Sequence, residues 1–119
     1  MQIELLKGKL HRATLTGCEI DYPGSLSIDR DLLDLAGIFP FEKILVVNQT
    51  NGQRLVTYAI EAARGSREFC LNGAAARLGI PGDMVTIMAF ALVDPAEASG
   101  WKPKVVVLAD QNRQVKVLR

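Results

Sequence analysis

The chain has 119 residues, 49% of them apolar, and its 14 basic and 13 acidic side chains nearly cancel. A chain of this length predicts one domain with a hydrophobic core of its own. It has no basic run typical of nucleic-acid or membrane binding, and no apolar segment long enough for a membrane span or an export signal. We therefore expect a soluble, cytoplasmic protein without a nucleic-acid or membrane partner.

The few potential metal ligands and thiols predict neither a metal site nor a disulfide framework. Cys18 and Cys70 are the only cysteines and His11 is the only histidine. A zinc site would have to combine both cysteines with a carboxylate, so no metal is predicted. Without an export signal the cysteines are expected to be reduced, although a disulfide between them is left open. The Gly-x-Gly-x-x-Gly motif and the phosphate-loop lysine motif, which bind nucleotides, are both missing from the sequence. No nucleotide cofactor is therefore predicted.

The first predicted elements are a short helix and a hairpin. Residues 30–36 favour a helix that Asp29 caps and Gly37 ends. Residues 44–47 are rich in β-branched side chains and predict a strand, and residues 55–60 predict its partner. Between them, residues 50–52 contain an Asn-Gly pair, which predicts a turn with positive φ at both central residues.

The second half of the chain predicts three more strands. Residues 73–78 favour a second short helix, which ends at the Gly-Ile-Pro sequence 79–81. Residues 83–93 predict a long apolar strand, residues 94–98 one further turn, and residues 104–108 and 115–118 a closing pair of strands. Short strands with closely spaced turn signals predict a mainly β fold, a small barrel with a few short helices.

The dipeptide Gly24-Ser25 is the most informative feature for function. In a strained turn a serine hydroxyl can attack the preceding carbonyl, and glycine leaves that carbonyl unshielded and the backbone free to adopt unusual dihedral angles. Pro-Gly-Ser is also an ordinary turn sequence, so the dipeptide alone does not distinguish the two interpretations. The residues around it do. The accompanying side chains and motifs are Lys9, His11, Arg12, Tyr22, Arg54, Thr57, Tyr58 and the run Asn72-Gly73-Ala74-Ala75.

At these spacings the chain closely resembles the aspartate 1-decarboxylase family, from about Leu6 to about Trp101. The resemblance implies a double-psi β-barrel, a homotetramer with active sites between subunits, and decarboxylation of L-aspartate to β-alanine for pantothenate and coenzyme A synthesis. It implies self-cleavage into a β chain, residues 1–24, and an α chain, residues 25–119, whose first residue Ser25 becomes a covalent pyruvoyl group. This group supplies the electron sink that pyridoxal phosphate supplies in other amino-acid decarboxylases. Whether a helper protein assists maturation is left open.

The resemblance also assigns residues to self-processing and catalysis. Thr57 is expected to donate to the oxyanion that forms on the Gly24 carbonyl, and later to contribute to substrate binding. By itself a threonine there is simply a residue favoured in strands. Tyr58 is expected to give a proton to Cα after CO2 leaves, although it too suits an ordinary strand. Because neighbouring strand residues face opposite sides, both serve one site only if the strand is bulged or the site straddles two subunits.

Substrate binding is assigned to cations and to backbone amides. Arg54 is expected to anchor the side-chain carboxylate of aspartate, since a tight ion pair with the departing carboxylate would favour the ground state. Without the resemblance, it would be read as a solvated hairpin arginine. Lys9 is the second cation, either for the same anchor or for polarising the imine that the substrate amine would form. The amides of Gly73, Ala74 and Ala75 begin a predicted helix and are expected to bind an anion, unless they are a plain helix start.

Three further residues are expected to support the site, and two positions depart from the family pattern. His11 and Tyr22 are expected to support the turn, and Asn72 to order the loop before the second helix. Val47 stands where many family members carry an aromatic side chain, which leaves more room in the pocket. Glu19 replaces a usual aspartate. Two alternatives follow: the same machinery acting on a related acid such as glutamate, and an unprocessed barrel that serves as a binding or structural module.

Overall fold

The computed structural model describes residues 1–118 and is built mainly from strands. The strands are β1 (Ile3–Thr14), β2 (Gly17–Glu19), β3 (Ser25–Asp29), β4 (Lys43–Asn48), β5 (Arg54–Ala62), β6 (Phe69–Asn72), β7 (Met84–Val93), β8 (Lys104–Ala109) and β9 (Gln114–Leu118). Three short helical segments join them: α1 (Arg30–Ala36) and the 3-10 helices η1 (Gly73–Leu78) and η2 (Pro95–Glu97). The prediction of a mainly β fold with a few short helices is confirmed.

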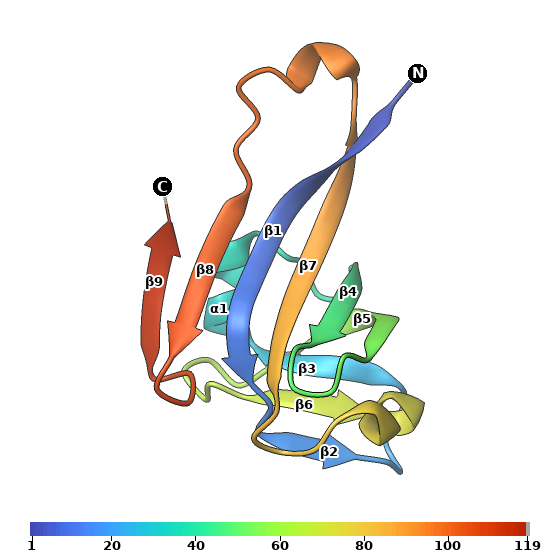
Figure 1. The fold of residues 1–119 in the computed structure, drawn as a ribbon, viewed down its shortest axis with the longest axis vertical. Helices are drawn as coiled ribbons and strands as arrows, with labels where there is room; N and C mark the ends of the chain where they lie inside the picture. The colour runs from blue at the N-terminus through green and yellow to red at the C-terminus, as the bar shows by residue number, and fades with distance from the viewer. Residues whose placement is uncertain (119) are drawn as a thin grey trace.

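The strands pair in the order β2-β6-β3-β5-β4-β7-β1-β8-β9. Most neighbours are antiparallel, but β1 with β8, β3 with β5 and β2 with β6 run parallel. Figure 1 shows β1, β7, β8 and β9 upright, while β2, β3 and β6 cross beneath them. The two groups enclose a core of aliphatic side chains and Phe69. The double-psi arrangement of the barrel stays a prediction.

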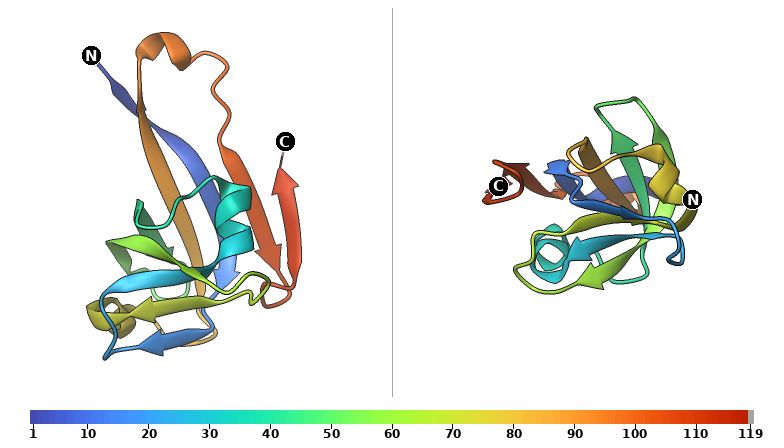
Figure 2. Two further views of the ribbon diagram at one scale, coloured as in Figure 1. Left: turned by 180° about the vertical axis from the view of Figure 1, so that it is seen from behind. Right: turned by 90° about the horizontal axis from the view of Figure 1, so that it is seen from below.

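Helix α1 forms where its capping residues predict it. The Asp29 carboxylate accepts a hydrogen bond from the Asp31 backbone N–H at 2.8 Å, and Gly37 ends the helix with φ of +68°. Leu32, Leu33 and Ala36 are fully buried, and Figure 2 shows the helix against the sheet near β8. Burial alone would raise the pKa of Asp29, but hydrogen bonds from the backbone N–H groups of Arg67, Asp31 and Gly65 hold it below its ordinary value.

The loop between β4 and β5 differs from the predicted turn. The two strands pair as expected, but five residues connect them, and only Gly52 has a positive φ, of +81°. The Asn48 side chain accepts hydrogen bonds from the backbone N–H groups of Thr50 and Asn51 at 3.0 and 3.3 Å. The prediction of positive φ at both central residues is wrong, because this side chain organises a longer loop.

The other predicted strands are confirmed, as is the turn at 94–98, where η2 forms. Four strands, β1, β2, β3 and β6, lie where no strand was predicted. The Gly24-Ser25 dipeptide therefore does not lie wholly in a turn, because Ser25 begins β3. Among the described residues, no helix has the length and apolar character needed to cross a membrane.

Candidate active site

Ser25 is the first residue of β3 and its side chain is inaccessible to solvent, with 1% exposure. The strand pairs antiparallel with β6, which places Ser25 directly opposite Asn72. The Ser25 hydroxyl donates a hydrogen bond to the Pro23 carbonyl oxygen at 3.3 Å. This hydrogen bond holds the buried Ser25 hydroxyl against the backbone of residues 23–25, which includes the Gly24 carbonyl.

Asn72 positions this hydroxyl directly. Its Nδ2 donates to Ser25 Oγ at 3.0 Å and to Ser27 Oγ at 2.8 Å, while its Oδ1 accepts from Cys70 Sγ at 3.4 Å. All hydrogen-bonding atoms of the buried amide are used, so its orientation is fixed. The predicted role for Asn72 was to order the following loop. The observed contacts are instead with Ser25 and Ser27, and the Asn72 side chain does not cap η1.

The backbone of Gly73 lies against one side of Gly24, which is otherwise exposed. A Cβ added to Gly73 would lie 2.7 Å from Gly24 Cα and 2.8 Å from the Tyr22 carbonyl oxygen. Gly73 also has φ of +67°, which disfavours any side chain. Gly24 itself lies outside the left-handed region, and a Cβ there would meet only the Asn72 carbonyl oxygen, at 3.8 Å. The unusual dihedral angle predicted for Gly24 is therefore found at Gly73.

A cavity of about 300 Å³ opens on the Gly24 segment. Thr57, Ala74 and Ala75 line it together with Gly24, so four predicted site residues meet there. The helix that begins at Gly73 is a 3-10 helix of six residues. Its dipole is accordingly smaller than an α-helix would supply, and the unpaired backbone N–H groups of its first turn are the feature that could hold an anion.

Thr57 and Tyr58 face opposite sides of a regular strand. Their register with β4 runs without a shift, pairing Thr57 with Ile44 and Tyr58 with Lys43. Thr57 is half-buried beside Gly24, whereas Tyr58 is 37% exposed and packs against Phe41 with ring centroids 6.4 Å apart. A bulge at this point is excluded, which leaves the second expectation: if both residues serve one site, two copies of the chain must form it.

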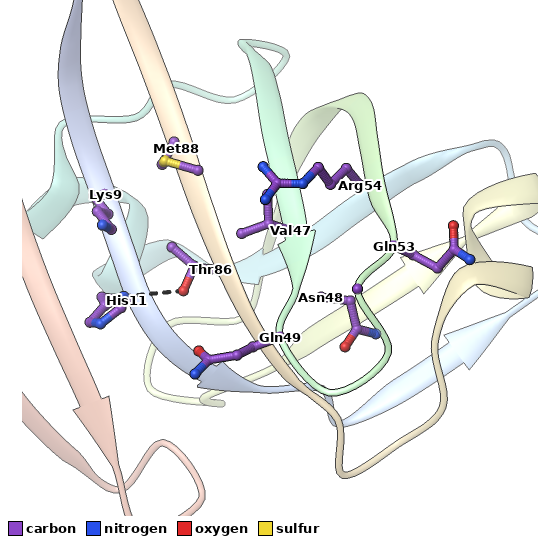
Figure 3. A pocket seen from close by; sticks show the side chains of 10 residues that line it. Lys9, His11, Val47, Asn48, Gln49, Gln53, Arg54, Thr86 and Met88 are labelled. Atoms are coloured by element: carbon purple, nitrogen blue, oxygen red, sulfur yellow. Dashed lines mark hydrogen bonds between the residues drawn. The ribbon is translucent and has the colours of Figure 1, made fainter.

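Lys9, His11 and Arg54 line a second pocket, of about 450 Å³, which we call the cationic pocket. Figure 3 shows Lys9 and His11 on β1, and Arg54 reaching from β5 toward Val47 on β4. No acidic side chain lines this pocket, and neither Lys9 nor Arg54 forms a salt bridge within residues 1–118. Two cations without a protein partner make the pocket suited to a carboxylate ligand.

His11 is the one imidazole of the chain and is partly buried in the cationic pocket. Its Nδ1 lies 3.2 Å from Thr86 Oγ1. Burial lowers its pKa below the ordinary value, and the charges of Lys9 and Arg12 lower it further. The imidazole is therefore neutral near pH 7 and above. The expectation that His11 supports the cleavage turn is not matched by any contact with it in one chain.

The two groups of predicted residues are thus separate within one chain. Arg54 points to one face of β5 and Thr57 to the other, in accord with their alternating exposure. Tyr22 is 51% exposed, and its backbone carbonyl oxygen lies 2.8 Å from the position that a Cβ on Gly73 would take. Both cysteines are free thiols, and burial raises the pKa of each. In the described part of the chain, no three His, Cys, Asp or Glu residues gather as metal ligands would.

Comparison with known proteins agrees with this set of residues. The family model described as aspartate decarboxylase matches residues 1–115. The chain belongs to the aspartate decarboxylase family. Among its relatives, the aspartate 1-decarboxylase of Carboxydothermus hydrogenoformans is 51% identical over 98% of this chain and 92% of its own length. That of Chlorobium chlorochromatii is 51% identical over 94% and 87%, and that of Thermoanaerobacter pseudethanolicus 46% identical over 98% and 100%. The predicted family is confirmed.

Two polar residues of this aspartate decarboxylase family member were missed, in whole or in part, by sequence reasoning. The contacts of Asn72 with Ser25 depend on the β3–β6 register, which no local pattern predicts. Thr86 lies in an apolar strand and was not considered, yet its hydroxyl contacts His11 inside the cationic pocket. A lone hydroxyl in an otherwise apolar strand was the only signal available.

Proposed function

We propose that this chain cuts itself between Gly24 and Ser25, converts Ser25 to a pyruvoyl group, and uses that group at an active site shared between subunits. The overall reaction is decarboxylation of L-aspartate to β-alanine and CO2 in pantothenate synthesis, the activity of the family to which the chain belongs. The observation that carries the self-processing proposal is the buried Ser25 hydroxyl, oriented by Asn72 beside an unsubstituted Gly24. We place the reaction in the cytoplasm.

Self-processing needs only groups of the chain itself and one water molecule. The Ser25 Oγ attacks the Gly24 carbonyl carbon, the peptide C–N bond breaks, and the hydroxyl proton passes to the nitrogen of residue 25, which leaves an ester. Loss of the Cα proton then expels the Gly24 carboxylate and leaves dehydroalanine. Addition of one water to its imine form gives the ketone and releases ammonia. The products are residues 1–24 and a chain that begins with the pyruvoyl group at position 25.

The contacts around Ser25 suit the first step. Asn72 donates to Ser25 Oγ, which directs the hydroxyl proton toward the Pro23 carbonyl and fixes the position of the oxygen. Because Gly73 has no side chain, its backbone can lie against Gly24, where an added Cβ would come within 2.7 Å of Gly24 Cα. Thr57 lines the same cavity as Gly24, and we assign its hydroxyl to stabilise the oxyanion that forms on the Gly24 carbonyl.

The position of Ser25 also fits a pyruvoyl group. The cavity beside Gly24 gives access to residue 25 once the chain is cut, and Asn72 would remain as a hydrogen-bond donor to the group. When present, the group accepts the electron pair that CO2 leaves behind. The backbone amides of Gly73, Ala74 and Ala75 would bind a substrate oxygen.

The side-chain carboxylate of aspartate is assigned to the cationic pocket. We assign Arg54 to the side-chain carboxylate of aspartate and Lys9 to the same anchor, since neither cation has a partner in residues 1–118. Tyr58 is assigned to return the proton to Cα. A phenol is protonated at neutral pH and can act as this acid without special tuning.

A homotetramer would bring these groups together. Arg54 and Tyr58 lie on the outer face of β5, opposite Thr57, so an aspartate that contacts Arg54 cannot reach the Gly24 side in the same chain. The outer face also exposes apolar side chains beside the cationic pocket, with Val56 60%, Phe90 39% and Leu92 65% exposed. Covering this face with a second copy would bury those side chains and complete the site.

Intact mass under denaturing conditions tests the self-processing proposal. The purified protein should separate into two pieces cut after Gly24, and the α piece should be one ammonia lighter than simple hydrolysis predicts. The same sample should release β-alanine from aspartate. Purified precursor that stays uncut on its own, but is cut after addition of cell extract, would show that a helper protein is needed. Aspartate turnover by a wholly uncut chain would refute the pyruvoyl mechanism.

A further inference from the structure

Strand β1 contains a bulge directly beside the cationic pocket. Leu10 pairs with Ile87 and Ala13 with Val85 in the neighbouring β7. Between these pairs, β1 has two residues, His11 and Arg12, whereas β7 has only Thr86. Arg12 takes up the extra length with φ of +62°, an uncommon value for a residue with a side chain. The bulge thus sets His11 and Arg12 together opposite the single residue Thr86.

The Thr86 hydroxyl holds both residues of the bulge. The Arg12 backbone N–H donates to Thr86 Oγ1 at 3.2 Å, and His11 Nδ1 lies at 3.2 Å from the same oxygen. Thr86 is only 4% exposed. Figure 3 shows its hydroxyl directed at the His11 ring. The oxygen therefore has two neighbours, one of which is certainly a donor.

The second contact then has a definite direction. If Nδ1 carried the proton, Thr86 Oγ1 would accept twice, and its own proton would lack an acceptor among the hydrogen bonds of residues 1–118. An unpaired buried donor costs about 1–3 kcal/mol. If Nδ1 is unprotonated, the Thr86 hydroxyl donates to it and every group is satisfied. The imidazole proton then lies on Nε2.

His11 Nε2 is open to a ligand. It has no hydrogen-bond partner in the described chain, and no side-chain nitrogen or oxygen there is both buried and unpaired, so Nε2 reaches solvent. The charged groups on this face are cationic: Lys9 and Arg12 on β1, Arg54 on β5, and Lys116 two strands away on β9. No carboxylate lines the pocket, and no acceptor within residues 1–118 hydrogen-bonds Nε2, so its N–H is available to an incoming acceptor.

We infer that Thr86 is a positioning residue of the cationic pocket: its hydroxyl closes the β1 bulge and holds His11 as the Nε2–H tautomer. A neutral N–H donor is thereby presented beside Lys9 and Arg54. Its use toward a substrate carboxylate rests on the proposed function. The tautomer itself does not.

Nitrogen NMR of the protein labelled with ¹⁵N-histidine tests the tautomer without activity. His11 is the one histidine in the sequence, so the two ring nitrogens are assigned without ambiguity. At about pH 8, well above the ordinary histidine pKa, the folded wild type should show a protonated Nε2 and an unprotonated Nδ1. The same chain unfolded in urea supplies the reference mixture of tautomers. A protonated Nδ1, or the mixture found in urea, would overturn the inference.

Variants of Thr86 test its role. Thr86→Val removes the hydroxyl at nearly constant volume and should return His11 to a mixture of tautomers. The KM for aspartate should rise about 2–10-fold, as expected for one hydrogen bond, with kcat nearly unchanged. Thr86→Ser should restore both readouts. Thr14→Val is the matched control, because the Thr14 hydroxyl of β1 has no hydrogen bond within residues 1–118.

A single tautomer in Thr86→Val, or no rescue by Thr86→Ser, would overturn the assignment to Thr86. If the valine variant does not fold, the wild-type spectrum and the serine variant still decide the tautomer. A wild type with the expected tautomer but no aspartate turnover would overturn the proposed function and the substrate role of His11, and would support the Thr86–His11 contact.

Discussion

The cleavage region and the cationic pocket are built in opposite ways. In the cleavage region the side chains of Ser25, Ser27 and Asn72 are buried and hydrogen-bonded to one another, and Gly73 lies against the exposed Gly24. In the cationic pocket, Lys9 and Arg54 lack protein partners in the described chain, and the cavity is larger. Under the proposed function, the first region reacts with the chain itself and the second binds an external anion. Substitutions should therefore separate self-processing from substrate binding.

The largest effect is expected for Ser25→Ala, which should stay a single chain with no decarboxylase activity. The change removes the hydroxyl proposed to attack Gly24, whereas the buried methyl group fits the same space. Ser27→Ala is the matched control, since Ser27 shares the Asn72 amide but is not next to the cleaved bond. Intact mass should find Ser25→Ala uncut and Ser27→Ala cut. Two pieces from Ser25→Ala would place the chemistry elsewhere.

Gly73→Ala should slow self-processing by about a hundredfold, the effect expected when reacting groups are displaced by about 1 Å. Its new Cβ would lie 2.7 Å from Gly24 Cα. Gly65→Ala is the control, because Gly65 also has a positive φ, of +80°, but nothing lies within 4 Å of its added Cβ. It should carry only the backbone cost, about 1–2 kcal/mol of unfolding free energy. The measurement is the rate at which the cut chains appear in each variant. Equal rates for Gly73→Ala and Gly65→Ala would show that contact with Gly24 is unimportant.

Tyr58→Phe should be processed normally but lower kcat roughly 10²–10⁴-fold, the usual range for a lost general acid. The change keeps the ring that packs against Phe41. The measurement is β-alanine formation in deuterated water by the processed variant, together with the mass of its α chain. We expect slow release and some transamination of the pyruvoyl group. If the variant had the wild-type rate and incorporated deuterium at Cα as the wild type does, Tyr58 would have only a packing role.

Arg54→Lys is the substitution for which only substrate binding is expected to change. Processing should be unchanged, because Arg54 does not line the Gly24 cavity. Lysine cannot form the two parallel hydrogen bonds of arginine with a carboxylate, and their loss should weaken transition-state binding by about 1.5–3 kcal/mol. Because the side-chain carboxylate is unchanged by the reaction, the loss should appear mainly as a higher KM. Steady-state kinetics on aspartate measure this. A lower kcat at constant KM would show that Arg54 acts on the departing carboxylate or the reacting bond.

The sequence predicted those elements whose signals are local. Asp29 and Gly37 mark both ends of α1, and the β-branched run at 44–47 lies in β4. The loop after β4 was mispredicted because the Asn48 side chain competes with the Asn-Gly turn. Strand β1 was missed although it is the longest strand. Its bulges and its mixture of charged and apolar residues interrupt a regular alternation.

The site was predicted as a set of residues, through family resemblance, but not as an arrangement. That Thr57 meets Gly24 while Arg54 faces away follows from the pairing of β5 with its neighbours, which no single segment encodes. The Asn72–Ser25 and Thr86–His11 contacts join residues 47 and 75 positions apart. Such contacts depend on sheet register, and only the folded chain shows them.

Subunit complementation tests the separation of the two regions most directly. Ser25→Ala retains the cationic pocket, and Arg54→Ala retains the cleavage region, so each variant alone should have little or no activity on aspartate. Co-expressed in one cell, with differently tagged chains purified together, they should form mixed oligomers. Some shared sites then combine an intact position 25 from one subunit with Arg54 from the other. We predict recovery of a substantial fraction of wild-type activity in the doubly tagged fraction. Mixed oligomers that form but show no activity above the separate variants would contradict a site built from two copies of the chain.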